Sequence, residues 1–203
     1  NILLLNGSGV DLNKFKFNFN IKKRNIILFP SRMLKSKGTL EFLESAKFLK
    51  NKYQNWKFVL IGDVSYKSPD SININLINEY VSKKYVELWK FSNEMKNIYD
   101  QVKIVCLPSY REGMPKVLLE AAAMGIPTIT SDDEGCEEAI IPNETGLICK
   151  KRNITSLINA IEKLINDNAL YNKLSNNSVL LAKNKFDVNI VNKTHLELYE
   201  KLF

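Results

Sequence analysis

Two glutamates, Glu112 and Glu120, are separated by seven residues within the stretch PSYREGMPKVLLEAAAMG at 108–125. Carboxylates accept hydrogen bonds from paired hydroxyl groups, such as those of sugars. We therefore expect one carboxylate to bind a sugar and the other a ribose, on either side of a diphosphate. Spacing alone leaves a simpler interpretation open, in which Glu120 forms a salt bridge to a neighbouring strand or caps a loop.

A helix is predicted to begin between the two glutamates. Pro115 suits the first helical position and Gly125 the position just past the end, so the helix spans about 115–124. Free backbone N–H groups at a helix N-terminus, helped by the helix dipole, bind phosphate without any special motif, and Lys116 adds a positive charge. The pattern therefore indicates a phosphorylated ligand.

A second group of basic residues follows another predicted strand, at 25–30. It contains Arg32, Lys35 and Lys37, within SRMLKSKG. Two predicted phosphate-binding groups, each at the end of a strand, support one another. The alternative interpretation is that the basic residues are solvated loop charges. A dinucleotide fingerprint is less favoured, because Gly7 and Gly9 are followed by Leu12 where a third glycine is needed.

Short apolar runs interleaved with helical patterns must position these residues. Strands are predicted at 25–30, 56–62, 102–108 and 126–130, and a helix follows Gly38 and Thr39 through Leu49. This alternation is typical of an α/β fold: a Rossmann-like, doubly wound parallel sheet with helices on both faces. Ligands of such sheets bind outside the carboxyl ends of the strands, which is where both groups lie.

The remaining segments are predicted to be a loop and a helical tail. Residues 64–75 form a long surface loop, and after Gly146 helices are expected at about 155–165, 170–185 and from there to 203, with no strand to cover. The single histidine, His195, has no flanking Cys, Asp or Ser, so we expect a structural or surface role.

Length and composition predict one compact domain of 203 residues, with 45% apolar residues and no apolar run of about 18. Three cysteines without metal-ligand spacing favour reduced, buried thiols in a cytoplasmic protein with no metal. The net charge of +7 indicates a solvated lysine-rich surface, or attraction to a phosphate-bearing or membrane-surface partner. Because residue 1 is Asn, we expect a piece of a longer chain.

Taken together, these motifs resemble a known family. The segment PSYREGMPKVLLEAAAMGIPTITSDDEGCEEAI is similar to the donor site of the retaining GT-B glycosyltransferases of family 4, whose paired glutamates match Glu112 and Glu120. SRMLKSKG resembles the family's Arg-x4-Lys-Gly donor loop, and NGSGVDLNKF resembles the segment just after the interdomain linker. The resemblance covers nearly the whole chain and indicates the C-terminal, donor-binding half.

The resemblance implies roles for individual residues. Glu112 contacts the transferred sugar and Glu120 the ribose, while Arg32 and Lys37 stabilise the departing diphosphate; Glu112, Arg32 and Lys37 are thus the expected catalytic residues. The expected nucleotide-sugar contacts also include the segment near the phosphate, Gly113, Met114, Pro115, Lys116 and Val117. No metal and no cofactor are implied, because the nucleoside diphosphate sugar is a substrate.

The resemblance also implies a domain organisation. Residues 1–203 form one nucleotide-sugar-binding domain, with a post-linker segment at about 1–20 and a helix at about 187–203 that crosses to an absent N-terminal acceptor domain. We expect transfer from a UDP-sugar to a sugar or lipid-linked acceptor in bacterial polysaccharide or lipopolysaccharide assembly, with peripheral contact at the inner face of the membrane. The isolated chain is expected to be inactive.

Two other functions stay open from the sequence. A related GT-B enzyme that epimerises or hydrolyses a nucleotide sugar would bind it in the same place, at the carboxyl ends of the strands. Such an enzyme would convert the nucleotide sugar without an acceptor. A non-catalytic module that binds nucleic acid through its basic surface would show salt-dependent binding to random duplex DNA. The leading interpretation predicts no nucleic-acid partner.

Overall fold

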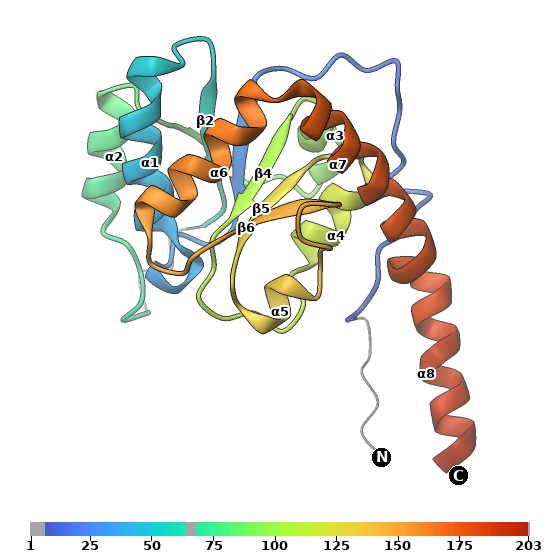
Figure 1. Ribbon diagram of the computed structural model, residues 1–203. Coiled ribbons are helices and arrows are strands. Elements are labelled where there is room, and N and C mark those ends of the chain that lie inside the picture. Colours follow the sequence, from blue (N-terminus) through green and yellow to red (C-terminus); the bar gives the residue numbers. More distant parts are fainter. Residues whose placement is uncertain (1–6, 64–67, 203) are drawn as a thin grey trace.

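The computed structural model describes residues 7–63 and 68–202, which fold around one parallel sheet with helices on both faces (Figure 1). The strands are β1 (Ile26–Pro30), β2 (Lys57–Ile61), β3 (Glu87–Trp89), β4 (Ile104–Leu107), β5 (Thr128–Ser131) and β6 (Gly146–Cys149). Every neighbouring pair is parallel. The predicted Rossmann-like, doubly wound fold is confirmed.

In the strand order β3-β2-β1-β4-β5-β6, the first strand of the sequence, β1, is one of the two central strands. The chain builds outward from β1 to β3, then returns to the other side of β1 with β4, where Ile27 pairs with Ile104 and Leu28 with Val105. The connections therefore leave β1 and β4 in opposite directions, which opens a crevice at their carboxyl ends.

The helices connect the strands and cover both faces of the sheet. They are α1 (Thr39–Lys52), α2 (Ile74–Ser82), α3 (Met95–Tyr99), α4 (Lys116–Ala123), α5 (Glu134–Glu137), α6 (Ile154–Asn166), α7 (Asn168–Leu181) and α8 (Val188–Leu202). A 3-10 turn (Lys35–Lys37) precedes α1, and a π-helical segment (Ala182–Phe186) separates α7 from α8. None of the helices in the described part of the chain is long and apolar enough to cross a membrane.

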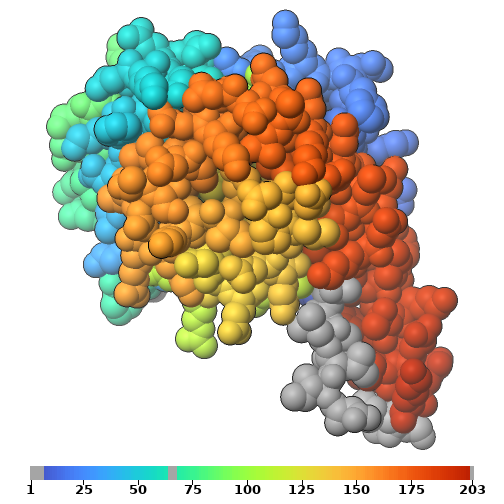
Figure 2. All heavy atoms as spheres, in the orientation of Figure 1, coloured from blue at the N-terminus to red at the C-terminus, as the bar shows by residue number. Residues whose placement is uncertain are grey.

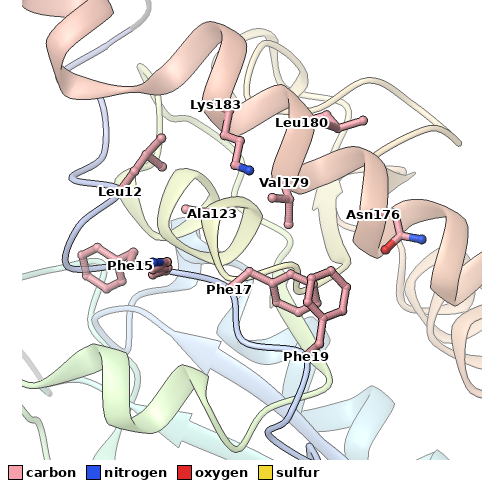
Figure 3. A pocket seen from close by; sticks show the side chains of 10 residues that line it. Leu12, Phe15, Phe17, Phe19, Ala123, Asn176, Val179, Leu180 and Lys183 are labelled. Atoms are coloured by element: carbon pink, nitrogen blue, oxygen red, sulfur yellow. The ribbon is translucent and has the colours of Figure 1, made fainter.

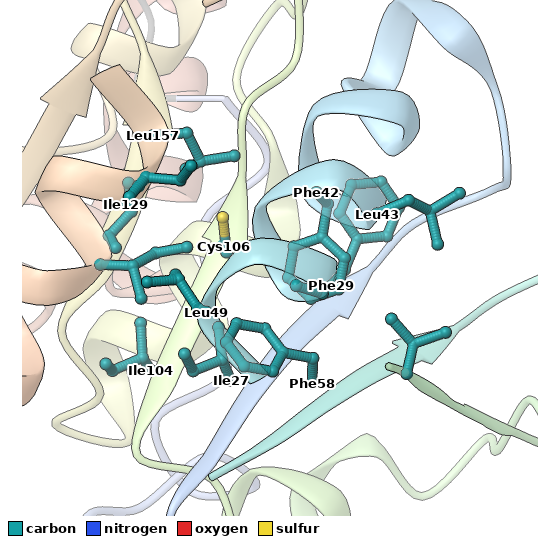
Figure 4. Close-up of a cluster of buried hydrophobic side chains, with 14 of the residues drawn as sticks. Ile27, Phe29, Phe42, Leu43, Leu49, Phe58, Ile104, Cys106, Ile129 and Leu157 are labelled. Carbon is teal, nitrogen blue, oxygen red and sulfur yellow. The ribbon is translucent and has the colours of Figure 1, made fainter. Parts of the chain in front are cut away.

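Two hydrophobic clusters fill the two sides of the sheet, because successive strand residues point to opposite faces. Ile27 and Phe29 of β1 pack with Phe42 of α1 and Leu157 of α6 (Figure 4). On the other face, Ile26 and Leu28 pack with the buried side of α4 and with Tyr99 of α3. Burial on both faces explains the continuous apolar runs that predicted these strands.

Strands β3 and β6 were not predicted, so the expectation that the tail has no strand to cover is wrong. Helix α6 packs against β5 and β6. Both missed strands lie at the edges of the sheet and are only three and four residues long. In β3 the side chains are only partly buried, with Leu88 38% exposed, and the sequence lacks the apolar run that marks a central strand.

The other predicted segments are placed as follows. The predicted loop at 64–75 includes residues 64–67, which lie outside the described residues, and its last two residues begin α2. The three helices expected after Gly146 correspond to α6, to α7 with its π-helical extension, and to α8; Phe203 lies outside the described residues. Residues 1–6 of the expected post-linker segment also lie outside the described residues. His195 lies on α8 and is partly buried.

Candidate functional site

Two loops form one wall of the crevice, the loop 31–38 after β1 and the loop 108–115 after β4. The Ser36 carbonyl accepts hydrogen bonds from the Tyr110 N–H at 2.7 Å and from the Ser109 hydroxyl at 3.1 Å. Gly38, at φ +76°, lies so close to the second loop that a Cβ would stand 2.2 Å from the Pro108 carbonyl oxygen. Contacts between the backbones of the two loops therefore fix their relative position.

Lys37 and Glu112 bridge these two loops. The Lys37 Nζ donates to the Glu112 Oε1 at 2.6 Å, and the side chains are only 16% and 17% exposed. A charge-assisted hydrogen bond in such a partly desolvated place is stronger than one on the open surface. The structure thus brings together a predicted phosphate-binding cation and a predicted sugar-binding carboxylate.

The loop that carries Glu112 is held from behind by the start of α5. The carboxylate of Asp133, at the N-cap of α5, accepts the Glu112 N–H at 2.9 Å and lies 3.5 Å from the Lys151 Nζ. A Cβ at Gly135 would lie 2.0 Å from the Gly113 carbonyl oxygen and 2.2 Å from that of Glu112. Asp133 and Gly135 are not among the predicted site residues, although they belong to a DDEG motif that follows a predicted strand.

Helix α4 begins at the crevice, one residue later than predicted. Pro115 has φ −74° and ψ 111°, so it is the extended N-cap and not the first helical residue, which is Lys116. No side chain caps the helix, which leaves its first N–H groups available for a ligand. Gly125 follows the helix end at φ +61°, as its predicted position requires.

A small pocket of about 150 Å³ opens beside this helix, at the carboxyl ends of β1 and β2. Arg32 from the first loop and Val117 from α4 both line it, together with Gly62, Asp63, Met95 and the 60% exposed Phe91. The pocket therefore joins two of the predicted residues and adds an exposed aromatic ring. Two neighbouring predicted residues differ in their surroundings. A Cβ added to Gly113 would meet no atom within 4 Å, whereas the side chain of Met114 packs against Gly7.

Glu120 lies deeper than the other predicted site residues, on the buried side of α4. It is 9% exposed and accepts a hydrogen bond from the Tyr99 hydroxyl at 3.2 Å. Burial raises the pKa of Glu120, while the Tyr99 hydrogen bond and the charges of Lys116 and Lys14 oppose the shift. Burial likewise raises the pKa of Tyr99 well above its usual value.

The simpler interpretation of Glu120 as a salt-bridge residue is not supported. Within residues 7–63 and 68–202, no lysine or arginine nitrogen lies within 4.0 Å of its carboxylate. A buried carboxylate held by one hydroxyl and no cation is costly to the fold, which favours a role in binding. In the same described part of the chain, no three or more His, Cys, Asp and Glu side chains are grouped to hold a metal ion.

Comparison with known proteins places the chain among glycosyl transferases. The family model "Glycosyl transferases group 1" matches residues 11–179. A Campylobacter jejuni protein, N,N'-diacetylbacillosaminyl-diphospho-undecaprenol alpha-1,3-N-acetylgalactosaminyltransferase, is 35% identical over 185 residues, which cover 91% of this chain and 47% of that protein. The chain thus spans about half the length of the curated relatives it matches.

Solved structures give the same picture of the fold. The C-terminal domain of a glycosyl transferase group 1 family protein (LpcC) from Francisella tularensis matches with a TM-score of 0.77 and 26% identity, covering 88% of this chain and 99% of that one. Anabaena Alr3699/HepE in complex with UDP-glucose matches with a TM-score of 0.82 and 18% identity, covering 95% and 56%. The second likeness concerns the fold alone.

Proposed function

The chain belongs to the group 1 glycosyl transferases, and we propose that it is the part of such an enzyme that binds the nucleotide-sugar donor. The observation that carries this proposal is the Lys37–Glu112 pair at 2.6 Å, at the switch point between β1 and β4. This pair sets a cation for a phosphate beside a carboxylate for sugar hydroxyls. A nucleoside diphosphate sugar offers both groups to one crevice.

In this proposal the diphosphate lies between Arg32, Lys37 and the first N–H groups of α4. When the bond between the sugar and the diphosphate breaks, the diphosphate oxygen keeps the electron pair and its negative charge grows. Two cations and the helix N-terminus, already in place, stabilise that charge more in the transition state than in the bound donor. The acceptor hydroxyl oxygen bonds to the sugar carbon, and its proton passes to the departing diphosphate, which leaves as the nucleoside diphosphate.

The two glutamates have binding roles at different depths. Glu112 accepts hydrogen bonds from hydroxyls of the transferred sugar, and Glu120, a turn and a half along α4, accepts them from the ribose. The residues Gly113 to Val117 approach the phosphates. These roles, and retention of the anomeric configuration, are taken from the family resemblance, and the placement of both carboxylates on or beside α4 supports them.

We propose UDP as the nucleotide and bacterial polysaccharide or lipopolysaccharide assembly as the process. The sequence resemblance supports both proposals, and a relative whose name includes diphospho-undecaprenol supports the second. The acceptor then binds an N-terminal domain outside this chain, which agrees with the half-length match to the relatives. The enzyme is a cytoplasmic one that works at the inner face of the membrane, and helix α8 crosses back to the N-terminal domain.

The test is turnover by the full-length protein with UDP-sugars, with and without a lipid-linked sugar acceptor. We expect UDP release that depends on both the donor and the acceptor, and that is lost in Glu112→Gln. UDP release or a new nucleotide sugar in the absence of acceptor would instead assign hydrolysis or epimerisation. Sugar transfer by the 203-residue chain alone would contradict the assignment of the acceptor site to another domain.

A further inference from the structure

A surface away from the crevice combines apolar side chains with lysines. It is formed by the N-terminal segment 12–24 and by residues 168–186, which comprise α7 and the π-helical segment; we call it the basic-aromatic surface. A pocket of about 340 Å³ opens between the two segments. Figure 3 shows Phe15, Phe17 and Phe19 on one side of it and the α7 residues Val179 and Leu180 on the other.

Two of these apolar side chains face solvent. Phe19 is 81% exposed and Leu180 is 56% exposed, although both are large and hydrophobic. Phe17 packs edge-on against Phe19 with ring centroids 4.4 Å apart, and a Cβ on Gly125 would meet the Phe17 ring at 2.8 Å. The rings are thus presented on a rigid support at the end of α4. Exposed apolar groups gathered in this way mark an interaction site.

The charges of the surface all have one sign. Residues 12–24 contain five Lys and Arg, residues 168–186 contain three, and neither segment contains any Asp or Glu. These eight cations leave 21 Lys and Arg against 22 Asp and Glu in all the rest of the chain. The net charge of +7 therefore comes from these two segments, which favours attraction to a phosphate-bearing or membrane-surface partner over a generally solvated lysine-rich surface.

Most of these cations have no acidic partner. Among the described residues, seven of the eight take part in no salt bridge: Lys14, Lys16, Lys22, Lys23, Arg24, Lys183 and Lys185. Lys23 contributes less, because burial lowers its pKa to about 8 and its ammonium donates to the Tyr99 carbonyl. Lys16 and Lys183 line the same pocket as the exposed rings, so charge and apolar area share one surface.

We propose that the basic-aromatic surface binds a lipid bilayer that carries anionic head groups. Phe19, Phe17 and Leu180 enter the boundary between head groups and acyl chains, and the lysines around them bind lipid phosphates. A nucleic acid would pair with the lysines but would leave the aliphatic side chains of the pocket in water. The inference stands on exposure and charge alone and does not require the proposed function.

The position of the surface is compatible with an open crevice. Ala123, at the C-terminal end of α4, lines the pocket, whereas the crevice lies at the N-terminal end of the same helix. Figure 2 shows the N-terminal segment (blue) at the outside of the molecule beside the orange and red C-terminal helices. A bilayer on this side therefore leaves the carboxyl ends of β1 and β4 accessible.

The test is co-sedimentation of the purified protein with vesicles of phosphatidylcholine alone, and of phosphatidylcholine mixed with phosphatidylglycerol. We expect binding to the mixed vesicles only, and a decline as salt is added. Lys16→Glu and Lys22→Glu should each weaken binding by roughly fivefold or more, the effect expected of one basic residue at an anionic surface. Phe19→Ser should also weaken it, because its ring no longer enters the bilayer.

Matched controls lie on the other face of the sheet. Phe48, on α1, is 61% exposed, and Lys163, on α6, is exposed, so Phe48→Ser and Lys163→Glu change the same chemistry elsewhere. Both should bind as the wild type does, and thermal unfolding should show that all variants fold. No binding to mixed vesicles at low salt, or equal losses in the control variants, would overturn the proposal. So would DNA binding of equal strength that Phe19→Ser leaves unchanged, since it would indicate a general polyanion surface.

Discussion

The side chains of Lys37 and Glu112, 75 residues apart in the sequence, form an ion pair of 2.6 Å that joins the loops after β1 and β4. Both side chains are largely buried, so each ion depends on the other for its solvation. The pair therefore holds the two loops of the crevice in register before any ligand is bound. A donor diphosphate then adds a second anion to a lysine that is already oriented.

The first prediction concerns this coupling. Lys37→Met and Glu112→Gln should each lower stability, because each leaves one partly buried ion without its partner, and the double variant should lose less than the sum. We expect a coupling free energy of about 0.5–3 kcal/mol from a double-mutant cycle in urea. The exposed Lys57–Glu87 pair at 2.7 Å serves as the control and should couple by at most about 1 kcal/mol. Equal coupling in both pairs would contradict the solvation argument.

The ionised Glu120 carboxylate should lower the stability of the fold while strengthening the binding of UDP. Burial raises its pKa, so the folded state disfavours the ionised form, and stability falls as pH rises through that pKa. Glu120→Gln keeps an oxygen for Tyr99 and removes the charge. We expect thermal unfolding at pH 7 to show a variant at least as stable as the wild type, with the difference shrinking at lower pH.

The same variant should bind UDP more weakly, because a neutral amide replaces a carboxylate at the ribose. A Glu120→Gln protein that is clearly less stable at pH 7 and binds UDP normally would assign Glu120 a purely structural role.

Gly135 and Gly113 form a matched pair of glycines around the Glu112 loop. Gly135→Ala should cost about 1–3 kcal/mol and displace the loop, because its Cβ would stand 2.0 Å from the Gly113 carbonyl oxygen. Gly113→Ala meets nothing within 4 Å and should change stability by no more than about 0.5 kcal/mol. Urea unfolding of both variants checks this, and a tolerated Gly135→Ala would mean that α5 can shift away from the loop.

Asp133 should orient Glu112 without touching the donor. Asp133→Ala leaves the Glu112 N–H without its acceptor and should lower stability by about 1–3 kcal/mol. We expect its affinity for UDP to be kept and its preference for a UDP-sugar over UDP to be lost, while Asp133→Asn restores that preference. Titrations with both ligands measure the two affinities. Equal weakening of both would show that Asp133 acts on the whole site.

The central strands and the candidate residues could be predicted because their signals are local. Apolar runs closed by Pro or Gly mark β1 and β2, and the start of α4 differs from its prediction by one residue. The edge strands were harder to predict, since β3 lacks an apolar run and the apolar run of β6 is only four residues long. Their pairing depends on neighbours that are distant in the sequence.

The contacts that shape the site were also out of reach of the sequence. Asp133 and Glu112 are 21 residues apart, as are Tyr99 and Glu120, and nothing in their spacing indicates that they meet. Such contacts follow from the order in which strands assemble. The family resemblance identified Glu112 and Glu120, but it did not identify Asp133 and Tyr99, which hydrogen-bond to them.

Calorimetric titration of the chain with UDP is the decisive test of the proposed donor site, and the Francisella tularensis structure of a C-terminal domain indicates that such domains can be studied alone. We expect binding that Glu120→Ala weakens by about 10- to 150-fold, the loss of a charged hydrogen bond, and that Arg32→Ala also weakens. The exposed-lysine variant Lys163→Glu should bind normally. Binding unchanged in both site variants, or no binding of UDP, GDP, TDP or ADP by the chain or the full-length protein, would contradict a donor site in this crevice.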